Sequence, residues 1–587
     1  MASSRFRRRT TAVLLLGFAA AACGSSDPEP PEAGATPSGS SSASDPVKGG
    51  TFVVGSSPPL PAQGTLNPAV NTQGGMQQAA GMLFNGLVEI DDKAEPVPAL
   101  AEKWDIADDG ATWVFTLRDG VMFHNGSPLT AADVKWTYEA ALLRNHARTQ
   151  SSIGPALATP CAAAPEPPSC SSIEAAEVSG STPATVTFRF AEPYGPLLQQ
   201  LTHTEGAILP RGIWDGQPPP TAAQPWPAGQ DPVGTGPFMF ASQNASEIVY
   251  ERNPDYFRSP EPYLDRVVIR AIEPAAQAQA LAAGEIDWLW GVSGQDVPAL
   301  ERNPDITIDR GTQSAGGSTN CVQKLAFNLF ERGTPPPAIR AGQGKPHPVL
   351  GDLSVRQAIA SALNTDTYVQ QVLQGNGELA TSPISSQIEF AHIEAPIPAF
   401  DQEASRKLLD QAGWVSAGEG RPRTRNGQPL SFDMFHFAGT EGTLATKMSQ
   451  DLALVGIEAR LQQVDGAGKN ALYKERKFDS IVVSNCQATD PEIGVRRFYA
   501  TAAITGAPFT NGAGYSNPEV DRLFTAAVQE IDPAARGELY GDIQKQIAAD
   551  LPYLWLLETT STRAYTKDCK ELRPYTGLFL EAAYCER

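Results

Sequence analysis

Residues 98–134 read PALAEKWDIADDGATWVFTLRDGVMFHNGSPLTAADV and carry the clearest structural pattern in the chain. Asp109-Gly110 is a turn pair of the kind that joins the strands of a β-hairpin. It precedes Thr112–Leu117, where large apolar and smaller residues alternate as in a strand. Residues 132–143 then have the spacing of an amphipathic helix. A strand followed by a helix indicates a mixed α/β fold.

The same succession of short strands and helices continues along the chain. Apolar, β-branched runs predict strands at 50–55, 248–250, 266–270, 325–328, 457–461 and 480–483. Helical periodicity predicts helices at 278–283, 354–373, 402–413, 443–455 and 534–549. No internal repeat is evident, so the α/β fold is expected to use nearly the whole chain.

The opening stretch and a set of later segments, taken in order, resemble one family. This family is the oligopeptide/dipeptide-binding branch of extracellular solute-binding proteins, called family 5. The later segments are Gly234–Phe238, Arg252–Phe257, Ala283–Asp287, Leu325–Asn328, Val355–Ile359, Ala404–Trp414 and Tyr515–Asp521. The resemblance covers residues 49–560, and most of the matching residues suit turns and element starts.

The resemblance implies a two-lobed, periplasmic-binding-protein-like (class II) α/β fold with an extra subdomain in lobe I and a two-crossing hinge. Lobe I would comprise residues 49–80, 206–318 and the tail 562–587. The extra subdomain would be 81–205, and lobe II would be 319–561. The two crossings would lie near residues 318 and 561.

The N-terminus has the layout of an export signal. Four arginines precede the apolar run 12–18, and residues 1–22 would be removed after export. Ala20-Ala21-Ala22-Cys23 resembles a bacterial lipobox, which implies a lipidated Cys23. The alternative is ordinary signal cleavage with Cys23 incidental. Residues 23–48 are rich in Pro, Ser and Gly and predict a disordered linker.

The net charge excludes one class of partner. It is −20 for the full sequence and −24 once the four arginines of residues 1–22 are removed. Nucleic-acid binding needs clustered Lys and Arg to meet phosphates, so nucleic acid is not an expected partner. No segment after the signal is apolar enough to cross a membrane, so the lipid anchor is the only membrane contact expected.

Seven cysteines are present, and Cys23 is reserved for lipid. In an exported protein, the even remainder indicates disulfides, although six cysteines allow many pairings. Proximity favours Cys161–Cys170 and Cys569–Cys585, which leaves Cys321–Cys486 by elimination.

Catalytic and metal-binding patterns are weak. None of the six histidines lies within four residues of another, and no Cys-x-x-Cys pair occurs. A Gly-x-Ser-x-Gly nucleophile elbow is also missing. We therefore expect no enzyme activity, no cofactor and no metal.

The resemblance also indicates where a ligand would bind. In peptide-binding relatives, an aspartate after a strand of the second lobe pairs with the peptide's free amine. Gln487 stands at that position here, and a neutral amide cannot supply a charge-assisted bond. The alternative is that Asp490 takes the place of that aspartate through a shift of one turn. Gln487 is either a ligand contact or a solvent-facing loop residue. The candidate ligand contacts are Ser57, Asn485, Gln487 and Asp490. Trp288 and Trp290 either stack on a ligand or, as alternate aromatics of a strand more often do, belong to the core.

The expected function is capture of a peptide or related small solute in an interlobe cleft, with delivery to the permease subunits of an ABC importer. The protein would be a monomeric lipoprotein on the outer face of the bacterial cell membrane. The family also handles nickel chelates, haem and oligosaccharides, so the ligand stays open. The alternative is a solute- or glycolipid-binding envelope lipoprotein with a regulatory role and no permease.

Overall fold

The computed structural model describes most of the chain from Pro46 to Arg587. The residues left out within this range are 61, 63–65, 71–80, 92–94, 144–152, 159–170, 180, 203–205, 222, 311–320, 419, 488–489, 508–509, 560–561 and 575–577. The signal segment 1–22, Cys23 and the linker up to residue 45 therefore lie outside the described residues, as do Cys161 and Cys170.

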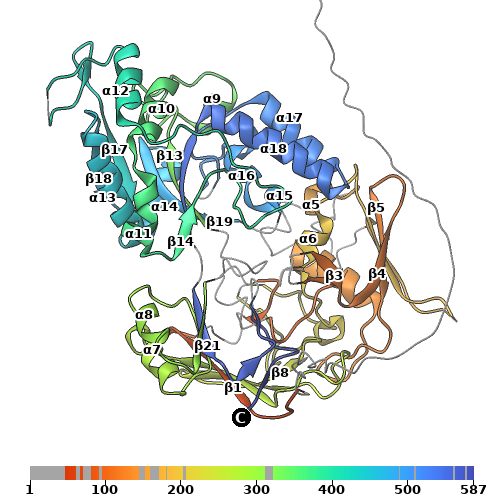
Figure 1. The fold of residues 1–587 in the computed structure, drawn as a ribbon. Helices are drawn as coiled ribbons and strands as arrows, with labels where there is room; N and C mark the ends of the chain where they lie inside the picture. The colour runs from red at the N-terminus through yellow and green to blue at the C-terminus, as the bar shows by residue number, and fades with distance from the viewer. Residues whose placement is uncertain are drawn as a thin grey trace, which may run out of the picture. The chain divides into compact units, whose positions relative to one another are not determined.

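The described chain forms three main sheets (Figure 1). The first is seven-stranded and uses strands from the beginning, middle and end of the chain. Its order is β12 (Ile306–Asp309), β21 (Arg563–Thr566), β11 (Trp288–Trp290), β1 (Thr51–Ser56), β10 (Arg266–Ala271), β9 (Glu247–Arg252) and β8 (Phe238–Gln243). β1 pairs in parallel with both β10 and β11. The short helices α7 (Pro274–Ala282) and α8 (Val297–Leu300) belong to this part of the chain.

The second sheet has four antiparallel strands and contains the predicted hairpin. Its order is β4 (Ala101–Ile106), β5 (Thr112–Leu117), β7 (Thr185–Arg189) and β6 (Ile173–Ala176). At the turn, the Asp109 carboxylate accepts hydrogen bonds from the backbone N–H groups of Ala111 and Thr112, both at 2.8 Å. Gly110 has φ +63°, a conformation that favours glycine. The turn prediction is confirmed. Helix α2 (Ala131–Trp136) follows, and a π-helical segment (Thr137–Leu142) continues it.

The third sheet has six strands. Its order is β14 (Gly377–Leu379), β20 (Tyr553–Thr559), β13 (Cys321–Phe327), β19 (Ser480–Cys486), β17 (Ser431–His436) and β18 (Glu458–Gln463). The accompanying helices are α10 (Leu353–Ala362), α11 (Tyr368–Leu373), α12 (Gln402–Gln411), α13 (Thr440–Ala453), α14 (Gly466–Glu475), α15 (Pro491–Gly494), α16 (Arg496–Tyr499), α17 (Pro518–Gln529) and α18 (Pro533–Asp550). α17 and α18 run side by side (Figure 1).

The helix predicted at 354–373 is broken in the structure. α10 ends at Ala362, a 3-10 turn follows at Thr365–Thr367, and α11 begins at Tyr368. The break coincides with Asp451, whose carboxylate accepts hydrogen bonds from the backbone N–H of Asn364 at 2.9 Å and from the hydroxyl of Tyr368 at 2.6 Å. A tertiary contact therefore competes with the helical periodicity at this point.

Two of the family-like segments fix each other in the interior. The backbone N–H of Gly234 donates to Nδ1 of His124 at 3.2 Å, and Nε2 of the same ring lies 3.0 Å from the carbonyl oxygen of Gly236. The ring is therefore neutral, with its proton on Nε2, and burial lowers the pKa of His124 to about 4. A Cβ at Gly234 would lie 1.9 Å from the carbonyl oxygen of Leu83, so only glycine fits there.

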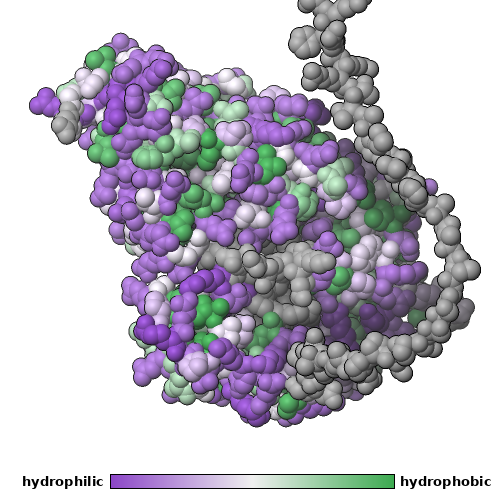
Figure 2. Space-filling model, in the orientation of Figure 1, coloured by the Kyte–Doolittle hydropathy of each residue, from purple (hydrophilic) through white to green (hydrophobic). Residues whose placement is uncertain are grey.

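The surface is mainly hydrophilic. On the face shown in Figure 2, hydrophobic residues form small groups among hydrophilic ones. Only a few large apolar side chains of the described residues are exposed: Val47, Ile106, Val178, Leu353, Phe400, Val415, Leu454 and Leu461. No helix of the described chain is both long and apolar enough to cross a membrane.

Candidate ligand-binding site

Strand β19 places the predicted site residues at one end of the six-stranded sheet. Its residues Ile481, Val482 and Val483 are buried, and β19 pairs antiparallel with β13 and parallel with β17. At its end, Cys486 lies directly opposite Cys321, and the two form a disulfide. The disulfide joins the ends of β13 and β19 covalently and so helps to fix the start of the segment that follows, residues 487–490.

Asn485 is the one predicted contact whose side chain has both polar atoms without a partner. It is 3% exposed, and neither its Oδ1 nor its Nδ2 has a hydrogen-bond partner among the described residues. An unsatisfied buried polar atom costs roughly 1–3 kcal/mol, and nearly all such groups in native proteins are satisfied. This amide is therefore available to a molecule that supplies one donor and one acceptor.

Gln487 is buried and is not a solvent-facing loop residue. Its side chain is hydrogen-bonded to a distant segment: Nε2 donates to the carbonyl oxygen of Pro383 at 2.7 Å, and Oε1 accepts from the backbone N–H of Ser385 at 3.0 Å. The amide thus holds the loop at 383–385 against the end of β19. A contact with a ligand would require an additional hydrogen bond from the same amide.

Asp490 is fully buried and already paired. Its carboxylate lies 2.8 Å from Nη2 of Arg536 and also caps α15 by accepting from the backbone N–H of Glu492 at 2.9 Å. Arg536 in turn donates to the hydroxyl of Tyr540. The carboxylate therefore connects α15 to α18, and its charge is balanced inside the protein.

Ser57 lies elsewhere in the fold. It follows β1 of the seven-stranded sheet, is exposed, and its Oγ accepts a hydrogen bond from Nε2 of Gln277 at 3.1 Å. The structure thus brings Asn485, Gln487 and Asp490 together and places Ser57 on a different sheet. Trp288 is fully buried and stacks on Tyr565 with ring centroids 5.3 Å apart, which is a core position.

Two further buried charges near this sheet end were missed in the sequence. Glu558, in β20, accepts hydrogen bonds from the hydroxyls of Ser385 and Ser386 at 2.8 and 2.9 Å, and from the backbone N–H of Ser386. It therefore fastens the same loop as Gln487. Lys324 lies in β13 and is 2% exposed. The signal for both was a single charged residue in a mostly apolar strand.

Lys324 is surrounded by aromatic rings. Its Nζ lies 3.6 Å from the ring centroid of Phe498 and 4.6 Å from that of Tyr553. Burial, and to a smaller extent the nearby positive charge of Arg497, hold the pKa of Lys324 well below its ordinary value. No carboxylate among the described residues forms an ion pair with it.

Glu492, close to this sheet end in the chain, is another charged group with an unpartnered atom. Its Oε1 lies 2.7 Å from Nη1 of Arg496, while its Oε2 has no hydrogen-bond partner among the described residues. Burial raises the pKa of Glu492 to about 7, although the charge of Arg496 acts in the opposite direction. This carboxyl group therefore changes its charge near neutral pH.

No group of three or more His, Cys, Asp or Glu side chains within the described ranges could hold a metal ion. A cavity of about 350 Å³ lies beside the C-terminal tail of the chain. It is lined by Thr307, Tyr565, Lys567, Cys569, Lys570, Glu571 and Leu572, and includes none of the predicted ligand contacts.

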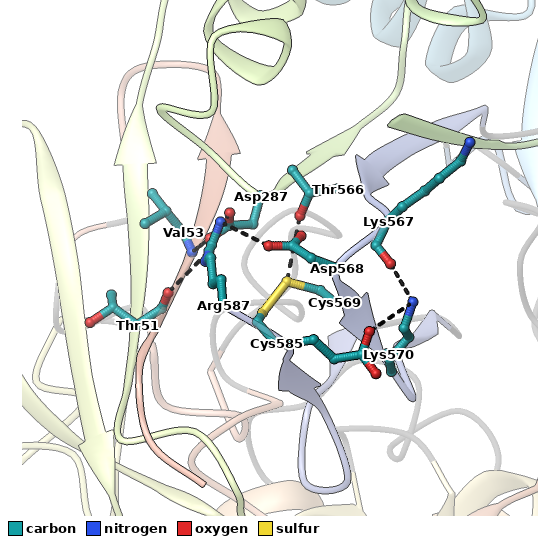
Figure 3. Close-up of a disulfide and its surroundings, with 11 residues drawn as sticks. Thr51, Val53, Asp287, Thr566, Lys567, Asp568, Cys569, Lys570, Cys585 and Arg587 are labelled. Carbon is teal, nitrogen blue, oxygen red and sulfur yellow. Dashed lines mark hydrogen bonds and ion pairs between the residues drawn. A yellow bond between two sulfur atoms is a disulfide. The ribbon is translucent and has the colours of Figure 1, made fainter. Parts of the chain in front are cut away.

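The C-terminal tail is fastened to the seven-stranded sheet (Figure 3). Cys569 and Cys585 form a disulfide that joins β22 (Cys569–Lys570) to β25 (Tyr584–Cys585). Beyond it, the Arg587 guanidinium lies 2.5 Å from the carboxylate of Asp287, which also accepts from the backbone N–H of Val53 in β1. The last residue of the chain is thus tied to the first strand.

Comparison with known proteins establishes the protein family of this chain. A family model described as bacterial extracellular solute-binding proteins, family 5 Middle, matches residues 95–506. Protein XP55 of Streptomyces lividans is 29% identical over 480 residues, covering 81% of this chain and 78% of XP55. The oligopeptide-binding protein AppA of Bacillus subtilis is 26% identical over 569 residues, 94% of each chain.

Solved structures agree on the fold. AppA from Bacillus subtilis in complex with a nonapeptide gives a TM-score of 0.66 at 23% identity, covering 92% of this chain and 100% of AppA. NikA from Brucella suis in complex with Fe(III)-EDTA gives a TM-score of 0.71 at 24% identity, covering 90% of this chain and 99% of NikA. The fold is that of a two-lobed periplasmic binding protein, as the sequence predicted. The chain belongs to the bacterial extracellular solute-binding proteins of family 5.

Proposed function

We propose that this protein captures a peptide or a related small solute between its two lobes and delivers it to the permease of an ABC importer. The family match over residues 95–506 carries the proposal, because relatives with this architecture include oligopeptide-binding proteins. The chain makes and breaks no bonds in this role. Ligand stabilises a closed form, which the permease distinguishes from the empty one.

The lobes are proposed to have the boundaries predicted from the sequence. Strands of the seven-stranded sheet come from within 49–80, 206–318 and 562–587, those of the four-stranded sheet from within 81–205, and those of the six-stranded sheet from within 319–561. The chain leaves the seven-stranded sheet after Asp309, enters the six-stranded sheet at Cys321, and returns between Thr559 and Arg563. Two connections suit a hinge.

Within the site, we assign the direct contact on lobe II to Asn485, because its amide has no hydrogen-bond partner in the part of the chain that the structure describes. Gln487 and Asp490 then act by holding the loop at 383–385 and helices α15 and α18 in place. Ser57, which is exposed after β1, is the proposed contact on lobe I.

The chain is further proposed to act as a monomeric lipoprotein on the outer face of the cell membrane, held through Cys23. A flexible linker over residues 23–48 would span roughly 25–30 Å root-mean-square, enough to keep the folded part near a membrane partner. Labelled palmitate should enter the wild-type protein in its native host and not the Cys23→Ser variant. Equal labelling of both would contradict the anchor.

A thermal-shift panel tests solute capture. Purified protein is heated with pools of dipeptides, tripeptides and nonapeptides, with metal chelates, and with oligosaccharides. A ligand at 100 times its Kd should stabilise the fold by about 2.7 kcal/mol. Stabilisation by any one pool supports capture of a small solute, and stabilisation by none would contradict it. Loss of solute uptake on deletion of a permease gene, with the binding protein intact, tests delivery.

A further inference from the structure

A buried amide without hydrogen-bond partners among the described residues, Asn485, and a buried lysine, Lys324, lie on one face of the six-stranded sheet. In the antiparallel pairing of β13 with β19, Val322 is opposite Asn485 and Lys324 is opposite Val483. Side chains two residues apart on a strand share a face, so Lys324 and Asn485 are diagonal neighbours on that face. Diagonal neighbours are separated by about 7 Å at their backbones, within reach of one bound molecule.

Lys324 is unlike a structural lysine. Its ammonium lies over aromatic rings, which attract a cation but accept none of its hydrogen bonds in the ordinary geometry. The positive charge of Arg497 adds to the effect of burial in lowering the pKa of Lys324. Burying a cation without a counterion is expensive, and an apolar residue in this apolar strand would avoid that cost.

The carboxylates near this sheet end are already engaged. Asp490 is paired with Arg536, and Glu558 accepts from the serines of the loop at 385–386. Glu492 is paired through one oxygen with Arg496. Lys324 is therefore a buried cation on this face, and it forms no ion pair among the described residues.

We propose that lobe II recognises a carboxylate of the ligand through Lys324 and an adjacent amide group through Asn485, so that the ligand is a peptide-like acid recognised without its free ammonium. The inference rests on the proposed function and narrows its substrate class. A carboxylate oxygen accepts from Lys324, while a peptide group offers the donor and the acceptor that Asn485 lacks.

Three tripeptide probes test this: trialanine, N-acetyl-trialanine and trialanine C-terminal amide, titrated into the full chain by calorimetry. N-acetylation should change the Kd by less than about threefold, because no carboxylate is assigned to the ammonium. Amidation should raise the Kd at least about tenfold, because it removes the charge that Lys324 meets.

Variants separate the ligand effect from folding. Lys324→Met should abolish the preference for the free acid and raise the Tm of the unliganded protein by roughly 1–3 °C, because it removes an uncompensated buried charge. Lys469→Met is the matched control. Lys469 is 3% exposed and lies 3.8 Å from the ring centroid of Phe437, but it has a carboxylate partner, Glu441, at 3.2 Å. That variant should lose thermal stability and keep the preference.

Several outcomes would overturn the inference. Equal binding of the free acid and the amide, or an unchanged preference in Lys324→Met, would remove Lys324 from the site while leaving solute capture intact. Loss of binding on N-acetylation would show that the ammonium of the ligand is recognised. If none of the three probes binds the wild-type chain, the assignment to peptide-like acids fails, whereas failure of every thermal-shift pool would contradict solute capture itself.

Discussion

Two buried lysines in the part of the chain that carries the six-stranded sheet have opposite electrostatic surroundings. Lys469, in α14, lies over Phe437 and forms an ion pair with Glu441 of α13. Lys324, in β13, lies over Phe498 and forms no ion pair with an acid among the described residues. The first charge is balanced by the fold and joins two helices. The second forms no ion pair among the described residues, and it lies on the sheet face that carries Asn485.

The same contrast separates the two amides at the end of β19. Gln487 has both of its polar atoms hydrogen-bonded to residues 383–385, whereas neither polar atom of Asn485 has a hydrogen-bond partner within the described ranges. Satisfied groups hold this end of the sheet together, and unsatisfied ones cost stability in the empty protein. The comparison teaches that candidate ligand contacts at this sheet end are to be sought among groups that have no partner within the described residues.

The largest effect on stability should come from removing one partner of a buried ion pair. Arg536→Met leaves the carboxylate of Asp490 uncompensated and should lower the free energy of unfolding by about 3–5 kcal/mol. Chemical denaturation followed by circular dichroism measures it. Arg522→Met removes an exposed pair with Glu519 and should change stability by less than about 1 kcal/mol. Similar losses in both variants would contradict the distinction between structural and surface pairs.

The neutral ring of His124 should make the folded protein sensitive to acid. The pKa of His124 is about 4 in the folded chain, against an ordinary value of 6.5, so the unfolded chain binds more protons between these values. The contribution of His124 to stability is complete above pH 6.5 and is lost as the pH falls toward 4, by up to roughly 3 kcal/mol. Urea unfolding at pH 7 and 4.5 measures the loss. His124→Asn should lack this part of the pH dependence, and an unchanged dependence would contradict the assignment.

The two amides provide a smaller, paired test. Gln487→Leu removes two hydrogen bonds to the loop at 383–385 and should cost about 1–3 kcal/mol of stability. Asn485→Leu removes two unsatisfied atoms at nearly constant volume and should leave the unliganded Tm unchanged or slightly raised, while weakening ligand binding. Differential scanning calorimetry of both unliganded variants measures these changes in Tm. A destabilised Asn485→Leu variant would show that its amide has a structural role.

Much of the fold was predictable because its signals are local. The turn at Asp109-Gly110 and the alternating strand that follows need only neighbouring residues, and the structure has both. The continuous helix predicted at 354–373 was wrong because Asp451, far along the chain, binds the backbone at Asn364 and the hydroxyl of Tyr368. Periodicity carries no information about such a contact.

The site was harder to predict because the sequence does not show whether a polar side chain has a hydrogen-bond partner in the folded protein. Asn485 and Gln487 were both expected to contact ligand, yet the partners of Gln487 lie about a hundred residues earlier, at Pro383 and Ser385. Lys324 was not singled out, since a lysine in a strand suggests a solvated edge and only the tertiary structure buries it. Sequence could place these residues at one strand end but could not distinguish the bonded ones from the unbonded ones.

The central claim is that the protein holds a small solute without transforming it. Mass spectrometry of the intact chain under non-denaturing conditions, mixed with a pool of tripeptides carrying free carboxylates, tests this directly. The account predicts one added peptide mass per chain, recovered chemically unchanged when the complex is dissociated. A spectrum showing only the bare chain, or peptides released as cleavage products, would contradict it.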